Sequence, residues 1–171
     1  MSEGDYLIGV LSDTHGRDDL AELAAGLFAE HRVRWVFHCG DIGDIRVVDA
    51  LLAKNLTVNY VFGNTDHDRP AMRRYIQRVG ATVADPFAEC ELAGRKIAVL
   101  HGDDHRLLGR LIDSQAYDFL LHGHTHLPRD ETVGRTRVLN PGALHRSSEP
   151  MIMLVELGSG QVRRLPIRRN P

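Results

Sequence analysis

Polar side chains with metal-binding chemistry follow the ends of several short apolar segments of the chain. The candidate ligands are Asp13, His15, Asp41, Asn64, His101, His124 and His126. Carboxylate, imidazole and amide oxygen groups bind first-row divalent metal ions, and this set is large enough for two ions. Two ions about 3.5–4 Å apart form a recurring arrangement for cleaving phosphate esters. The residue types therefore predict a binuclear metal site with phosphoesterase chemistry.

The spacing of these residues suggests how they share two ions. Asp13 and His15 are two positions apart, and His124 and His126 repeat that spacing. Residues two apart on extended backbone point the same way, so we expect each pair to converge. Asp41 is placed to bridge the ions with both of its oxygens. A bridging water would lose its proton near neutral pH and attack the phosphorus, while the ions neutralise charge on the phosphoryl oxygens.

The elements that must position these residues alternate between strand and helix in the first half of the chain. The predicted strands cover 6–11, 34–38 and 56–62, and the predicted helices cover 18–31, 45–53 and 70–79. This order is typical of βαβ units and a parallel sheet with covered faces. Ligands of open α/β sheets bind beyond the carboxyl ends of the strands, which is where the candidate ligands stand.

The second half of the chain has a different, strand-rich pattern. We expect a hairpin over 90–100 that turns at Ala93-Gly94, one helix over 106–115 and strands over 119–122, 151–157 and 161–167, with a strand-rich stretch over 131–139 that has turn residues near Gly134. The pattern predicts a mixed or antiparallel arrangement but does not settle which strands pair. No linker or repeat interrupts the chain, so we expect a single domain over residues 1–171.

Composition narrows the class of protein. Hydrophobic residues make up 43% and charged residues 26%, which is typical of a globular domain. The net charge of −2 argues against general coating of nucleic acid, which needs a basic face. No apolar run approaches the ~20 residues of a membrane span, so no membrane association is expected. The two cysteines, in unrelated contexts, favour a reducing cytoplasm over a disulfide framework.

Five motifs that contain the candidate ligands resemble those of a known family. They are Ser12-Asp13-Thr14-His15-Gly16, Gly40-Asp41, Gly63-Asn64, His101-Gly102 and Gly123-His124-Thr125-His126. In this order, over residues 7 to about 142, they resemble the calcineurin-like metallophosphoesterases, and in particular the small bacterial and archaeal phosphodiesterases of that superfamily. The resemblance implies an α/β fold in which helices flank a sandwich of two sheets.

The resemblance also implies a division of the ligands. Asp13, His15 and His126 are expected on one ion, Asn64, His101 and His124 on the other, and Asp41 between them. Of these residues, Asp41, Asn64 and His124 are expected at the catalytic centre. Manganese is the expected ion, with nickel, iron or zinc as alternatives that suit the same mixed ligands.

The chain departs from the family pattern at Thr65. Many members have a histidine there that helps to protonate or steady the leaving group, and threonine is a poor general acid. The alternatives are an acid supplied by His67 or by a metal-bound water, or a preference for activated esters. The turn at Asn140-Pro141-Gly142 also resembles a family motif. The predicted substrate contacts are Asn64, His67, His145 and Arg146.

Several polar residues are expected to have structural roles only. We predict that Cys39 is a buried small hydrophobe and that His38 and His122 are buried near the site. Asp66 is predicted to be a structural hydrogen-bond acceptor, and His105 to lie at a helix start.

The leading hypothesis is a metal-dependent phosphodiesterase that acts on a small phosphate ester, with nucleotides among the possibilities. A second hypothesis is a non-catalytic binding scaffold that resembles the eukaryotic retromer subunit of this fold. The presence of every candidate ligand argues against this scaffold, and the absence of the general-acid histidine argues for it. A Rossmann-type nucleotide binder ranks last, because no G-x-G-x-x-G follows the first apolar segment. Protein partners and oligomeric state cannot be read from the sequence.

Overall fold

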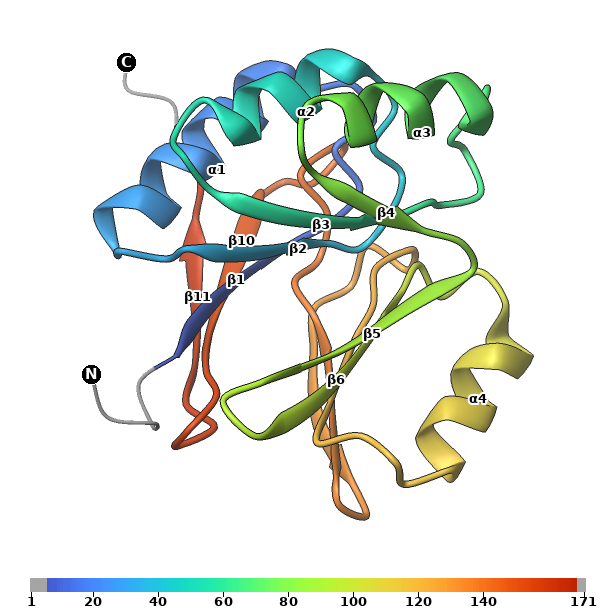
Figure 1. The fold of residues 1–171 in the computed structure, drawn as a ribbon. Coiled ribbons are helices and arrows are strands. Elements are labelled where there is room, and N and C mark those ends of the chain that lie inside the picture. Colours follow the sequence, from blue (N-terminus) through green and yellow to red (C-terminus); the bar gives the residue numbers. More distant parts are fainter. Residues whose placement is uncertain (1–5, 169–171) are drawn as a thin grey trace.

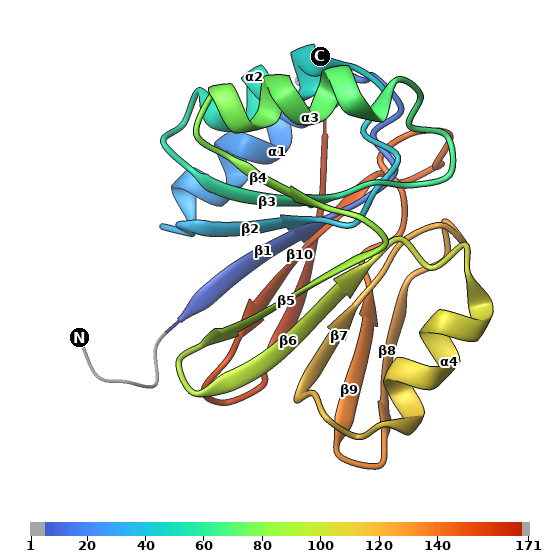
Figure 2. The same cartoon turned by 45° about the vertical axis from the view of Figure 1, so that its right-hand side comes forward.

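Two β-sheets lie face to face in the computed structural model, which describes residues 6–168 (Figure 1). The first sheet has six strands in the order β11-β10-β1-β2-β3-β4, and the second has five in the order β5-β6-β7-β9-β8. Helices cover the outer face of each sheet (Figure 2). The predicted fold class, two sheets flanked by helices, is confirmed.

The first sheet is built from both ends of the chain. Its strands are β1 (Leu7–Leu11), β2 (Trp35–His38), β3 (Thr57–Val61), β4 (Thr82–Ala84), β10 (Met151–Glu156) and β11 (Val162–Pro166). The strands β1 to β4 run parallel, whereas β10 pairs antiparallel with β1 and with β11. The helices on its outer face are α1 (Asp18–Glu30), α2 (Ile45–Leu52) and α3 (Arg69–Arg78) (Figure 1).

The second sheet comes from one continuous stretch of the chain. Its strands are β5 (Phe87–Leu92), β6 (Arg95–Leu100), β7 (Phe119–Leu121), β8 (Arg129–Val133) and β9 (Thr136–Asn140). β6, β7 and β9 run parallel, and the hairpins β5–β6 and β8–β9 make the outer pairs antiparallel. The helix α4 (His105–Asp113) covers the outer face of this sheet (Figure 2).

Three of the helices, α2, α3 and α4, begin at a capping aspartate, whereas α1 has no side-chain cap. Asp44 accepts a hydrogen bond from the amide of Arg46 at 2.9 Å, and Asp104 accepts from Arg106 and Leu107 at the start of α4. Asp68 accepts from Ala71 in the same way at the start of α3. Capping oxygens satisfy backbone N–H groups that have no partner within the helix, so these aspartates set where α2, α3 and α4 begin.

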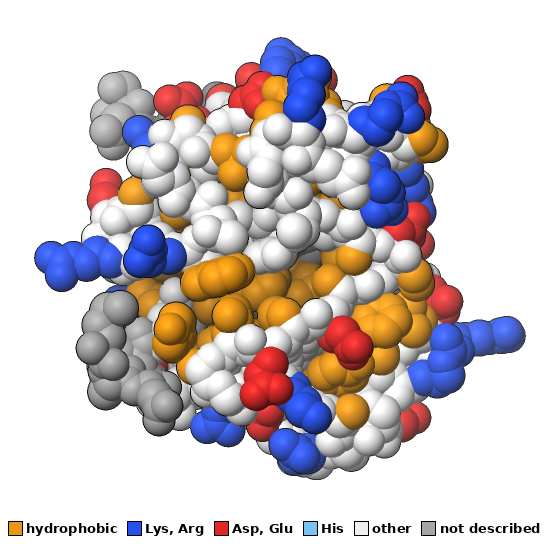
Figure 3. Space-filling view, viewed as in Figure 1, with side chains coloured by type: hydrophobic (Ala, Val, Ile, Leu, Met, Phe, Trp, Pro, Cys, Tyr) orange, Lys and Arg blue, Asp and Glu red, His pale blue; other side chains and the backbone are white. Residues whose placement is uncertain are grey.

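Three apolar clusters hold the layers together. Ile8, Val10 and Phe37 meet Val99 and Leu121 between the two sheets. A second cluster joins the first sheet to α1, α2 and α3, and a third joins the second sheet to α4. Figure 3 shows hydrophobic side chains gathered in the hollow between the two layers on one face of the molecule. No helix in residues 6–168 is long and apolar enough to cross a membrane.

The sequence pattern predicted most elements to within one to three residues but missed two features. β4 was not predicted, because it is only three residues long and none of them is fully buried. The pattern also gave no partner for the last two strands. They extend the first sheet, where Ile8 lies opposite Val155, although the chain has just left the second sheet. On this return the chain passes beside the end of β1, where the amides of Leu144 and His145 donate to the carbonyls of Ser12 and Asp13.

Candidate metal centre

The candidate ligands converge where the carboxyl ends of strands from both sheets meet. Asp13 and His15 follow β1, Asp41 follows β2, Asn64 follows β3, His101 follows β6, and His124 and His126 follow β7. Beside them is a cavity of about 350 Å³. Its lining residues are His15, Asp41, Asn64, Thr65, His124, His126, His145 and Arg146. The expectation that residues distant in the sequence share one edge of the fold is therefore confirmed.

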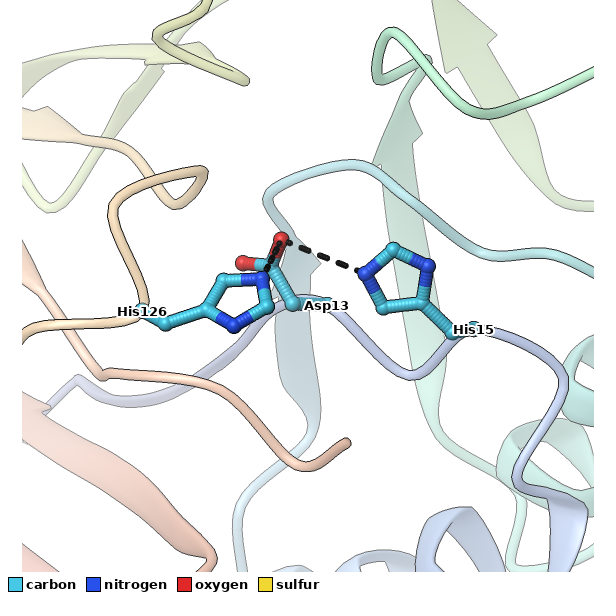
Figure 4. Close-up of side chains that lie close together, drawn as sticks. All are labelled: Asp13, His15 and His126. Atoms are coloured by element: carbon cyan, nitrogen blue, oxygen red, sulfur yellow. Dashed lines mark ion pairs between the residues drawn. The ribbon is translucent and has the colours of Figure 1, made fainter. Parts of the chain in front are cut away.

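Asp13 is the centre of the first ligand cluster. Its Oδ1 atom lies 3.2 Å from Nε2 of His126 and 3.8 Å from Nε2 of His15 (Figure 4). Its other oxygen accepts hydrogen bonds from the Ser12 hydroxyl at 2.6 Å and from the His124 amide at 3.1 Å. Asp13 is fully buried. Its Oδ2 atom is hydrogen-bonded, whereas its Oδ1 atom faces the imidazole rings of His15 and His126.

The ligand atoms of this cluster that lack a hydrogen-bond partner are suited to binding a cation. Asp13 Oδ1 and His15 Nε2 are both buried, and neither has a hydrogen-bond partner within residues 6–168. An unpaired buried carboxylate oxygen is costly unless a positive charge compensates it. The ligand atoms of Asp13, His15 and His126 all lie within 4.8 Å of one another, so these three residues can hold a divalent ion.

The second cluster is organised around Asn64. Its Oδ1 atom lies 3.0 Å from Nε2 of His101 and 3.1 Å from Nδ1 of His124. The Nδ1 atom of His101 lies 2.8 Å from the carbonyl oxygen of Cys39. A carbonyl can only accept, so Nδ1 of His101 carries a hydrogen and donates it. This hydrogen bond fixes the ring with Nε2 facing the other ligands, as is usual for metal-binding histidines.

Asp41 lies between the two clusters. Its Oδ2 atom is 3.5 Å from Nε2 of His15 and 3.4 Å from Nε2 of His101, while Oδ1 accepts from the amide of Thr65 at 2.9 Å. Burial acts to raise the pKa of Asp41, but the adjacent His101 ring and the Thr65 amide outweigh it and lower that pKa well below its ordinary value. Asp41 is thus a carboxylate that stays charged between histidines of different sheets.

A second compact group of His and Asp donors consists of Asp13, Asp41 and His101. The expected division instead placed His101 with Asn64 and His124. The two descriptions overlap, because His101 lies close to both Asp41 and Asn64. The described residues therefore contain His/Asp clusters consistent with a binuclear metal site, and the two groups have Asp13 in common.

The backbone at the ligands differs from the extended form expected from their spacing. The residues Asp13 (φ 56°), His15 (φ 45°), Asp41 (φ 56°), His124 (φ 66°) and His126 (φ 59°) all have left-handed backbone. The expectation of two extended pairs is therefore wrong. Each strand is followed at once by a tight turn, and hydrogen bonds such as Asp13 N–H to the Gly40 carbonyl hold these turns together. Left-handed backbone is costly for residues other than glycine and is often found at functional sites.

Two residues that organise the loops were not identified from the sequence. Thr14 contacts Nε2 of His38 at 2.9 Å and donates to the carbonyl of Ile42 at 3.0 Å, which ties the first ligand loop to the second. Asn140 donates to the Gly123 carbonyl at 2.8 Å and accepts from the Gly142 amide at 2.8 Å. It thereby joins the loop of His124 and His126 to the turn before His145. The Asn140-Pro141-Gly142 turn was the sequence signal that pointed to Asn140.

The predicted substrate contacts do not all reach the cavity. His145 and Arg146 line it, and the ring centroids of His145 and His15 are 5.1 Å apart. Burial, together with the nearby His15 and Arg146, lowers the pKa of His145. His67 is exposed and is not among the lining residues. Arg146 has no hydrogen-bond or ion-pair partner within the described part of the chain, which leaves its guanidinium available to an anion.

Among the residues predicted to be structural, Asp66, His38, His122 and Cys39 are buried, and His105 is the first residue of α4, as predicted, and is exposed. Asp66 accepts from the amides of Gly43 at 2.9 Å and Gly63 at 2.8 Å. His122 is buried beneath the ligand loop, and burial lowers its pKa to about 4. Cys39 is fully buried, and burial raises the pKa of its thiol. These groups support the ligand loops from inside the fold.

Comparison with known proteins identifies related sequences and structures. The profile of the calcineurin-like phosphoesterase superfamily domain matches residues 6–160. Phosphodiesterase MJ0936 from Methanocaldococcus jannaschii is 30% identical over 136 residues, which are 79% of this chain and 82% of that protein. A solved structure described as a novel archaeal phosphodiesterase superposes with a TM-score of 0.88 at 27% identity, covering 94% of this chain and 99% of that one.

A protein that is not described as a phosphodiesterase also shares the fold. Vps29 from Chaetomium thermophilum superposes with a TM-score of 0.68, covering 96% of this chain and 100% of that chain. Its sequence identity is only 14%, so this similarity concerns the fold alone.

Gly63→Ala tests how closely the backbone must approach Asp41. A Cβ atom at Gly63 would overlap the Asp41 carboxylate, so we expect this variant to bind metal more weakly and to lose about 1–3 kcal/mol of unfolding free energy. Gly109→Ala in α4 is the matched control, because nothing lies within 4 Å of its added Cβ. The control should gain about 0.5–1 kcal/mol. Urea unfolding and calorimetric titration with Mn²⁺ measure both effects, and equal behaviour of the two variants would contradict the steric argument.

His38 gives a pH-dependent contribution to stability. Burial lowers its pKa to about 3, so the folded protein keeps this ring neutral, whereas the unfolded chain takes up a proton near pH 6.5. Stability is therefore lost as the pH falls from 6.5 toward 3, by about 2 kcal/mol at pH 5. The free energy of unfolding of the metal-free protein, measured in urea, should fall less between pH 7 and pH 5 in His38→Gln than in the wild type, because the variant lacks the contribution of His38. Parallel curves for the two proteins would show that His38 does not titrate in this way.

Proposed function

The chain belongs to the calcineurin-like phosphoesterase superfamily, and we propose that it hydrolyses a phosphodiester where the ends of its two sheets meet. One observation carries the proposal. The Asp41 carboxylate lies 3.5 Å from His15 and 3.4 Å from His101, which come from different sheets, and each of these histidines belongs to its own donor cluster. Phosphoester hydrolysis is the chemistry that such a shared carboxylate serves.

We assign the metal-binding residues as two overlapping sets. Asp13, His15 and His126 would hold one ion, Asn64, His101 and His124 the other, and Asp41 would contact both. When bound, divalent ions neutralise charge on the phosphoryl oxygens and make an attacking water acidic enough to ionise near neutral pH. Manganese is our choice of ion, because the mixed nitrogen and oxygen donors suit it. Nickel, iron and zinc suit the same donors.

The remaining lining residues bind and orient the ester. Arg146 offers an unpaired guanidinium beside the His15 cluster, where it can donate to a phosphate oxygen through two N–H groups. His145 lines the cavity beside the His15 ring, with the two ring centroids 5.1 Å apart, and can hydrogen-bond to the ester. Asn64 also lines the cavity and can contact the ester as well as an ion.

The leaving group receives little help from this chain. Thr65 occupies the place of the expected acid, and His67, the other protein candidate, lies outside the cavity lining. We therefore propose that activated diesters, whose alcohols leave without protonation, are the preferred test substrates. Nucleotides remain within the proposed substrate class. We also propose one catalytic domain over residues 1–171 in a cytoplasmic setting, in keeping with two free cysteines.

Hydrolysis of bis-p-nitrophenyl phosphate by the metal-stripped protein tests the proposed function. Adding Mn²⁺, Ni²⁺, Zn²⁺ or Mg²⁺ should restore turnover, with Mn²⁺ giving the highest rate. Asp41→Ala and His126→Ala should lose at least about a hundredfold in kcat/KM, because each removes a ligand worth several kcal/mol of charge stabilisation. His31→Ala, at the end of α1, is the matched control and should retain full activity.

Comparison with the monoester p-nitrophenyl phosphate separates phosphodiesterase from general phosphatase activity. A higher kcat/KM for the diester is expected. Tight metal binding without turnover of either ester would overturn the proposal, and it would favour the scaffold hypothesis instead. Pull-down of protein partners would then be the appropriate next measurement.

Arg146→Gly tests the assignment of the substrate contact without damage to the fold. Arg146 has left-handed backbone (φ 52°), which glycine adopts freely, so the variant should unfold at the same or higher urea concentration. Loss of a charged hydrogen bond should raise KM for the diester by about tenfold or more, since such bonds contribute 1.5–3 kcal/mol. An unchanged KM would place the ester elsewhere in the cavity.

A further inference from the structure

Thr65 touches two of the proposed metal ligands at once. It follows Asn64 in the turn after β3, is half-buried, and lines the cavity. Its hydroxyl oxygen lies 3.3 Å from Nδ1 of His15, and its backbone amide donates to Oδ1 of Asp41 at 2.9 Å. The turn after β3 therefore contacts the ligand loops that follow β1 and β2.

Both contacts involve the atom of the ligand that faces away from the other donors. With Nδ1 of His15 held by Thr65, Nε2 points toward Asp13 and Asp41. With Oδ1 of Asp41 held by the Thr65 amide, Oδ2 points toward His15 and His101. The result is a separation of 3.5 Å between His15 Nε2 and Asp41 Oδ2, the two atoms available to an ion.

The hydroxyl also bears on the protonation of the His15 ring. A neutral imidazole carries its hydrogen on one nitrogen only, and the nitrogen that binds a metal must be the other one. If the Thr65 oxygen accepts from Nδ1–H, then Nε2 has the free lone pair that a metal needs. If the hydroxyl instead donates to Nδ1, the hydrogen sits on Nε2 and the ring cannot bind an ion. Metal-binding histidines usually donate their second N–H to a neighbouring oxygen.

We propose that Thr65 is a positioning residue for the metal centre. Its hydroxyl accepts from Nδ1–H of His15 and selects the ring form that binds metal through Nε2, while its amide turns Asp41 Oδ2 toward His15 and His101. This inference rests on the proposed function only in requiring a metal at the site. It gives the side chain at this position a task different from that of the family's histidine, because Thr65 holds a ligand and does not protonate the substrate.

Three variants separate the hydroxyl from the amide and from the fold. Thr65→Val keeps the shape and the amide but removes the hydroxyl, and Thr65→Ser keeps the hydroxyl. Thr82→Val is the matched control, because it removes a threonine hydroxyl that donates to Asn59 far along the sheet from the ligand loops. Urea unfolding of the metal-free proteins shows whether each variant remains folded.

Calorimetric titration of the metal-stripped proteins with Zn²⁺ and Mn²⁺ is the main measurement. Thr65→Val should weaken one of the two binding events by about 10–100-fold and leave the other unchanged, because only His15 loses its partner. Thr65→Ser and Thr82→Val should both bind as the wild type does. In the Zn²⁺-loaded wild type, ¹⁵N chemical shifts of the His15 ring should show the hydrogen on Nδ1.

The possible failures are distinguishable. If the wild type binds two ions and Thr65→Val binds them equally well, the positioning role is overturned while the proposed function stands. If Thr65→Ser behaves like Thr65→Val, the hydroxyl is not the active group and the proposal is overturned as well. If the wild type binds no metal, both this inference and the proposed function fail.

Discussion

The structure depends on holding the carboxylates of Asp13 and Asp41 out of water while only half of each is hydrogen-bonded. Asp13 uses Oδ2 and Asp41 uses Oδ1, and the remaining oxygens face histidine side chains. Buried carboxylates are costly unless positive charge is close, so the surrounding chain must bring it there. The tight turns after β1 and β2 and the glycines packed against the carboxylates, Gly63 and Gly123, follow from that requirement.

Neither sheet carries the complete set of donors, so the sandwich itself is part of the site. Of the candidate donors, the first sheet provides the two carboxylates, His15 and Asn64, whereas the second provides His101, His124 and His126. The apolar cluster between the sheets, which contains Val10 and Leu121, brings the ends of β1 and β7 together. The antiparallel pairing of β10 with β1 then fixes the first sheet from its other side. Packing far from the cavity therefore determines the distances within it.

Much of this arrangement could be predicted from the sequence, because apolar runs and polar residues alternate in a regular way. The strands of the first half, the hairpin at Ala93-Gly94 and the positions of the ligands beyond their strands all follow from local pattern. The pairing of β10 with β1 could not be predicted, because strand partners depend on contacts between distant residues. The left-handed backbone at Asp13 and the role of Asn140 were missed for the same reason. Both depend on carbonyl groups that loops from elsewhere in the chain supply.

The shortest ion pair of the first cluster joins Asp13 to His126, which are more than a hundred residues apart in the sequence. A cation held by these two side chains would act as a reversible cross-link between the first ligand loop and the last. In the chain-entropy description, a covalent link across such a loop restricts the unfolded chain by roughly 4.7 kcal/mol. Metal coordination would thereby restrict the unfolded chain in the way that disulfides do in secreted proteins. A nascent chain could close this link only after β7 and the loop that carries His126 had left the ribosome.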